Sequence, residues 1–237
     1  MTKVLLAPPA LGTVLSLTGL PGGSNKIHDR SPYGNVGTIV GATWAKLPGG
    51  LWCLSFDGSD DYVNCGNASS LNPTTAMTLM AWVYLTGGLD TDHRLVMCRD
   101  ASNQRMGGLY VHMNNKRLEF YVSKSATGNF TVLSATTGDW VYNTWNFVAA
   151  IYQYVADGTS IMRLFKDSLE VGSTSSAVGP LATTSSNTEI GRKGFTVDRQ
   201  WWQGYIALAR IFNRSMTALE IRGYFDQEKH LFGVWQT

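Results

Sequence analysis

Residues Leu54–Val63 read LSFDGSDDYV, and this stretch decides the fold class. Leu54 and Phe56 alternate with the polar Ser55, which is the period-2 pattern of a half-buried strand. The Asp57-Gly58 dipeptide that follows tolerates positive φ and turns the chain back. A second strand pattern follows at Met77–Val83 (MTLMAWV) and contains Trp82. Together these segments predict an all-β, antiparallel sandwich in which Phe56 and Trp82 lie in one core.

Composition limits the chain to a small number of classes. It has 237 residues, 44% of them hydrophobic and 15% charged, with 25 glycines and a formal net charge of +2. This balance is typical of strands and turns in a single domain, and it does not favour nucleic-acid binding. We expect one domain over residues 1–237, with an N-terminal extension at 1–13 and a C-terminal tail at 226–237 packed on the sandwich. No apolar run approaches membrane-spanning length, and the first residues do not form a convincing signal peptide. The expected localisation is therefore a soluble protein, on a virion surface if viral and otherwise extracellular.

One helix is signalled near the end of the chain. Thr217 and Glu220 have the spacing of a capping box, and Met216 and Ile221 have that of a hydrophobic staple. Leu219, Tyr224 and Phe225 would give this helix its apolar side.

Five patterns occur in a fixed order along the chain: a polar turn at Asp29–Asn35, the two strand segments above, Trp145–Ala149, and a closing segment from Ile190 to Ile221. In this order they resemble the laminin-G-like, concanavalin-A-like jelly-roll family. The resemblance implies a two-sheet antiparallel jelly roll with one short C-terminal helix. It also implies a non-catalytic module that binds glycans, proteins or surfaces, often with a structural calcium ion.

Calcium is the expected cofactor, and its candidate ligands are Asp29, Asn35 and Asp57. Carboxylate and amide oxygens are the ligands that this ion prefers. The alternative is an Asx turn in which Asp29 binds its own backbone. Where the family usually has an aspartate after its F-x-G-x-I segment, this chain has Ala207, so one carboxylate associated with the ion is missing.

The tryptophans are the stronger functional signal. Neighbouring residues on a strand point to opposite faces, so a buried Trp202 would leave Trp201 facing outward beside Asp198 and Arg199. Such an aromatic surface stacks on sugars or anchors a protein interface. Trp140 and Tyr142 are similar candidates. The alternative is that these rings only cover the edge of the sandwich.

The sequence favours a non-enzymatic recognition or assembly module. The leading hypothesis is a phage or virion surface protein (decoration, fibre or receptor-binding) with capsid or tail partners and possible homo-oligomers. The alternative is a carbohydrate-binding or adhesion module that contacts a glycan or protein surface. A glycoside hydrolase is disfavoured, because no glutamate has a second carboxylate two positions away on a strand.

Overall fold

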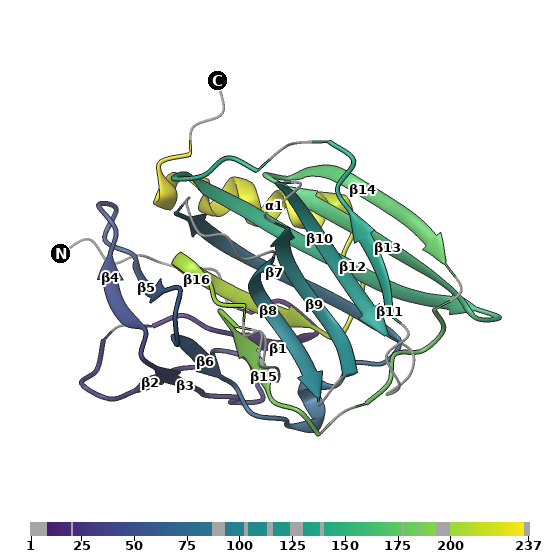
Figure 1. The fold of residues 1–237 in the computed structure, drawn as a ribbon, viewed down its shortest axis with the longest axis horizontal. Helices are drawn as coiled ribbons and strands as arrows, with labels where there is room; N and C mark the ends of the chain where they lie inside the picture. Colours follow the sequence, from purple (N-terminus) through teal and green to yellow (C-terminus); the bar gives the residue numbers. More distant parts are fainter. Residues whose placement is uncertain are drawn as a thin grey trace.

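The computed structural model describes residues 9–19, 21–86, 93–101, 104–112, 116–123, 130–137, 140–176, 178–183, 185–192 and 200–234. Two eight-stranded sheets pack face to face, and every strand pair within them is antiparallel (Figure 1). The predicted jelly-roll sandwich is therefore confirmed.

Sheet 1 has the order β14-β13-β12-β7-β16-β5-β4, with β1 pairing beside β16. Its strands are β1 Thr13–Ser16, β4 Thr43–Lys46, β5 Trp52–Asp57, β7 Ala76–Leu85, β12 Trp145–Ala156, β13 Thr159–Lys166, β14 Leu169–Ser176 and β16 Gln203–Phe212.

Sheet 2 has the order β11-β10-β9-β8-β15-β6-β3-β2. Its strands are β2 Lys26–Ile27, β3 Gly37–Val40, β6 Tyr62–Asn64, β8 His93–Ala101, β9 Gln104–His112, β10 Arg117–Ser123, β11 Phe130–Ser134 and β15 Thr188–Ile190. A short 3-10 helix, η1 (Ser69–Leu71), lies between β6 and β7.

The main core lies between the two sheets. Leu54, Phe56 and Trp202 point into it from sheet 1, and Val63 and Ile190 point into it from sheet 2. The predicted inward alternation of Leu54 and Phe56 is confirmed. Trp202 is fully buried, which is the condition under which Trp201 was expected to face outward.

A second core covers the outer face of sheet 1, where helix α1 (Ala218–Glu228) and the 3-10 helix η2 (Lys229–Phe232) pack on the strands. Trp82 belongs to this core, and its ring stacks on Phe232 at a centroid distance of 4.2 Å and on Phe225 at 5.6 Å. The prediction that Trp82 shares a core with Phe56 is therefore wrong. Strand β7 is buried on both faces, so its even-numbered residues face the helix rather than the other sheet. Trp145 lies at the margin of this second core and is half-buried.

Helix α1 begins with the predicted capping box. The Thr217 hydroxyl accepts a hydrogen bond from the Glu220 N–H, and the Glu220 carboxylate accepts one from the Thr217 N–H. Met216 and Ile221 are both buried, as the staple predicted. Leu219 is 78% exposed, so the prediction that it packs on the sandwich is wrong.

A buried ion pair joins α1 to sheet 1. Arg210 on β16 and Glu228 at the end of α1 are each 6% exposed, and their side chains form a two-pronged hydrogen-bonded pair. The Trp82 indole N–H also donates to Glu228, at 2.9 Å. Three elements that are distant in sequence therefore meet at one carboxylate.

The cysteines whose side chains are described are free thiols. Cys53 and Cys65 are both buried, and the Cys98 side chain lies outside the described part. Within the described ranges, no helix has the length and apolarity needed to cross a bilayer.

Candidate functional site

Trp201 lies at the entrance to strand β16. It forms an isolated antiparallel bridge with Arg192, and the next residue, Trp202, donates its N–H to the Gly191 carbonyl at 2.7 Å. Because Trp202 points into the main core, Trp201 points the other way, as the sequence predicted. Its side chain is half-buried rather than fully exposed.

Tyr62 and Arg192 lie against the Trp201 ring on the outer side of sheet 2. The Tyr62 ring lies 6.2 Å from it, centroid to centroid, at an interplanar angle of 49°. The guanidinium carbon of Arg192 lies 3.3 Å from the Tyr62 centroid and 5.5 Å from the Trp201 centroid, which places the cation against both rings. We refer to Tyr62, Trp201, Arg192 and Glu189 as the aromatic cluster.

Glu189 fixes the orientation of Arg192. Its two carboxylate oxygens accept from the Arg192 Nε at 2.8 Å and from Nη2 at 2.5 Å. Such a fork is the strongest geometry that this pair of groups adopts. The Arg192 side chain is only 11% exposed and that of Glu189 only 5%, so the guanidinium is held in place before any ligand arrives.

Register explains why Tyr62 belongs to this cluster. On β3, β6 and β15, the residues Ile39, Val63 and Ile190 face the main core. Tyr62 pairs with Val40 and therefore shares the opposite, outer face with it. Sequence reasoning missed Tyr62, Glu189 and Arg192 as partners of Trp201, because only the pairing of distant strands brings them together.

The other predicted binding residues have different positions. Asp198 and Arg199 lie outside the described residues, so their place beside Trp201 stays a prediction. Trp140 is 3% exposed and belongs to the main core, so the expectation that it offers an exposed ring is wrong. Tyr142 is partly buried and packs against the same core.

The predicted calcium ligands do not form one group. The Asp29 carboxylate accepts hydrogen bonds from the Ser16 N–H, from the N–H and hydroxyl of Ser31, and from the Asn35 N–H, at 2.6–2.9 Å. The Asn35 amide donates to the Val14 carbonyl at 2.8 Å and to Ser70. These contacts match the alternative, in which Asp29 and Asn35 shape the backbone. Calcium binding itself stays a prediction.

Asp57 lies instead in an acidic turn with Asp60 and Asp61, directly before Tyr62. The carboxylate oxygens of these three residues come within 4.8 Å of one another. Asp57 accepts from the Ser59 N–H at 2.8 Å, and Asp61 accepts from the Asp57 N–H at the same distance. Burial raises the pKa of Asp61, and the neighbouring Asp57 and Asp60 raise it further. The hydrogen bonds within the turn support a turn-forming role for these residues.

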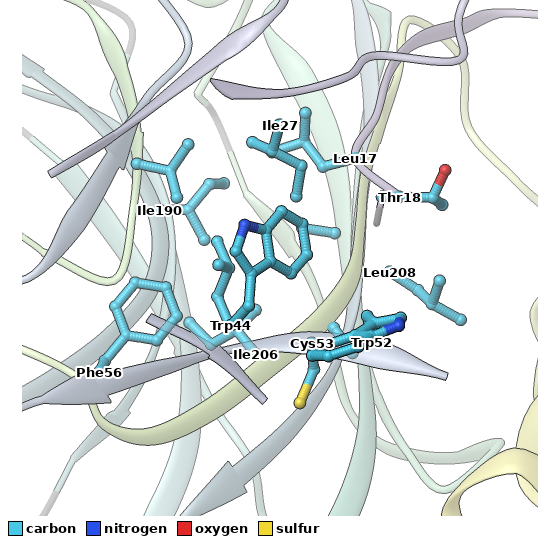
Figure 2. A pocket seen from close by; sticks show the side chains of 15 residues that line it. Leu17, Thr18, Ile27, Trp44, Trp52, Cys53, Phe56, Ile190, Ile206 and Leu208 are labelled. Atoms are coloured by element: carbon cyan, nitrogen blue, oxygen red, sulfur yellow. The ribbon is translucent and has the colours of Figure 1, made fainter. Parts of the chain in front are cut away.

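A small cavity opens where β16 changes partner from β5 to β1. Its lining is almost entirely apolar and includes Leu17, Ile27, Trp44 and Phe56 (Figure 2). The cavity volume is about 20 Å³. That volume suits a single water molecule and is far too small for a sugar ring. We therefore assign the cavity to core packing and not to ligand binding.

Comparison with known proteins agrees with this architecture. A family model described as the concanavalin A-like lectin/glucanases superfamily, of the laminin G type, matches residues 57–222. No curated protein is significantly similar to the chain in sequence.

Several solved structures are similar in fold. The binding domain of Paraclostridial Mosquitocidal Protein 1 matches with a TM-score of 0.71 and 13% identity, over 91% of this chain and 52% of that one. The receptor binding domain of botulinum neurotoxin D matches with a TM-score of 0.68 and 13% identity, over 92% of this chain and 53% of that one. The receptor binding domain of the C/D mosaic neurotoxin gives 0.67 and 12%, over 92% and 51%. The chain thus spans about half the length of these structures.

Proposed function

Because the chain belongs to the concanavalin A-like lectin/glucanases superfamily, we propose that it is a non-enzymatic recognition module that binds a glycan through the aromatic cluster. The observation that carries this proposal is the half-buried Trp201 ring set beside Tyr62, with Arg192 held against both. The similar structures include binding and receptor-binding domains, which supports a recognition role.

The cluster has the properties of a sugar platform. An aromatic ring with one accessible face stacks on the C–H face of a sugar, and nearby polar groups bond to its hydroxyls. Here the fork between Glu189 and Arg192 holds the guanidinium against both rings, so the aromatic surface itself is rigid. A locked site loses little side-chain entropy on binding, which favours affinity.

Catalysis is a poorer match to the same residues. Glycoside hydrolysis needs one carboxyl group to protonate the leaving oxygen and a second to attack or to activate water. Glu189 is 4% exposed and bonded on both oxygens to one guanidinium, so it is not placed to protonate a substrate. Assembly on a capsid or tail, the leading hypothesis from sequence, stays a prediction that no contact among the described residues favours.

A glycan array followed by calorimetry tests the proposal. We expect the wild type to bind at least one glycan class and Trp201→Ala to weaken it by about 1–3 kcal/mol, the value of one lost stacking contact. Trp145→Ala is the matched control, because Trp145 is also half-buried but lies against the second core on the opposite sheet. Absence of binding on a broad array would contradict the proposal, as would equal losses in both variants when both remain folded by thermal melting.

A further inference from the structure

An acidic turn adjoins the aromatic cluster. The acidic turn that holds Asp57, Asp60 and Asp61 ends at the residue before Tyr62, and Asp57 pairs in register with Gln203, two residues after Trp201. The turn therefore lies next to the cluster along both strands that supply its rings. Asp57 and Asp60 are exposed to solvent, while Asp61 is buried.

The cation of the cluster does not offset these carboxylates. Arg192 is already paired with Glu189 through two hydrogen bonds, and both side chains are largely buried. A charge that is neutralised by a buried partner contributes little to the field felt by a ligand. The cluster itself is thus close to neutral, and the exposed turn beside it is negative.

We propose that the aromatic cluster accepts uncharged sugars and discriminates against sugars that carry a carboxylate or sulfate group. The proposal rests on the glycan-binding function proposed above and adds the chemical class of the ligand. The Debye length is about 10 Å at 0.1 M salt, so a turn that ends directly before Tyr62 should still act on an acidic sugar stacked on Trp201 when the salt concentration is low. Like charges that face each other across an interface weaken the binding of the wrong ligand and so create specificity. We expect acidic sugars to bind roughly tenfold more weakly than neutral ones of the same shape at low salt.

The test compares matched sugars on the wild-type protein. Galactose and galacturonic acid oligosaccharides have the same stereochemistry and differ in the carboxylate, so calorimetry at about 20 mM and about 500 mM salt isolates the charge effect. We expect the neutral ligand to bind more tightly, with a preference that shrinks as salt is added. The double variant Asp57→Asn and Asp60→Asn should shrink the preference too, because it removes the two exposed carboxylate charges. The turn should keep its shape, because the amide oxygen introduced at position 57 can still accept the Ser59 N–H. Asp226→Asn, a carboxylate on α1 against the other sheet, is the control and should leave the preference unchanged.

The outcomes separate the two proposals. Equal or tighter binding of the acidic sugar, still weakened by Trp201→Ala, would overturn the charge selectivity and leave the glycan site standing. A neutral preference that persists in the double variant and at high salt would overturn the role of the acidic turn. If the pair does not bind, the same comparison is made with the neutral and sialylated forms of the best array ligand. Loss of every glycan signal would overturn both proposals together.

Discussion

Replacing Glu228 tests the attachment of helix α1 to sheet 1. The side chain is 6% exposed, forms a two-pronged pair with Arg210, and accepts the Trp82 indole N–H at 2.9 Å. Glu228→Gln keeps the shape and one carbonyl oxygen for Trp82, but it leaves the Arg210 cation buried without a counter-charge. Breaking a buried ion pair on one side costs about 3–5 kcal/mol. For a domain of this size, we expect the melting temperature to fall by roughly 10 °C.

Urea unfolding at pH 7 gives the free energy, and a matched control isolates the cause. Asp226→Asn changes an exposed carboxylate on the same helix, one that pairs with Arg222 and Lys229 on the surface, and it should leave the unfolding midpoint nearly unchanged. Combining Arg210→Met with Glu228→Gln should regain much of the loss, because no cation is then left buried and the glutamine oxygen still accepts the Trp82 N–H. A Glu228→Gln loss below about 1 kcal/mol would refute the reasoning, since it would mean that Arg210 reaches solvent without cost.

Three further predictions concern single contacts. A side-chain hydrogen bond from Arg214, together with the smaller effect of the cap contact with Thr217, lowers the pKa of Glu220 from 4.5 to about 2. The stability that the ionised Glu220 provides is therefore present above about pH 4.5 and is lost as the pH falls toward 2. Urea midpoints should show this loss in the wild type and a smaller one in Glu220→Gln. Gly204→Ala should destabilise the protein strongly, because φ is +129° and the added Cβ would lie 2.1 Å from the Tyr84 carbonyl oxygen; a melting temperature within a few degrees of wild type would contradict this. Burial raises the pKa of Cys53 to about 12, so mass spectrometry should find this thiol unmodified by iodoacetamide at pH 8 until the protein is unfolded, and rapid native labelling would show that the strand opens.

The sequence predicted what depends on local spacing. The inward alternation of Leu54 and Phe56 and the capping box of Thr217 and Glu220 each involve residues within four positions of one another, and the structure confirms them. The outward direction of Trp201 followed in the same way from its neighbour Trp202. Such features need no knowledge of which strand pairs with which.

Features set by long-range pairing were beyond the sequence. Trp82 alternates with Ala81 as in any strand, so its pattern could not show that a helix, rather than the other sheet, covers its face. The contact of Tyr62 with Trp201 depends on strands more than 100 residues apart being paired through β15. Glu228 looks like an ordinary polar residue at the end of a helix until Arg210 is placed beneath it.

The second core has a practical consequence for how the protein can be handled. Helices α1 and η2 occupy the outer face of sheet 1 and lie directly before the last described residues of the chain (Figure 1). The aromatic cluster lies instead on the outer side of sheet 2. Among the described residues, the short η1 is the only helix that comes directly before or after a strand of sheet 2 in the sequence. A tether joined at Val234 would thus start from the helical layer on sheet 1, because Val234 packs against the second core. Surface immobilisation through the C-terminal end should orient the binding face toward solution, whereas random lysine coupling would not.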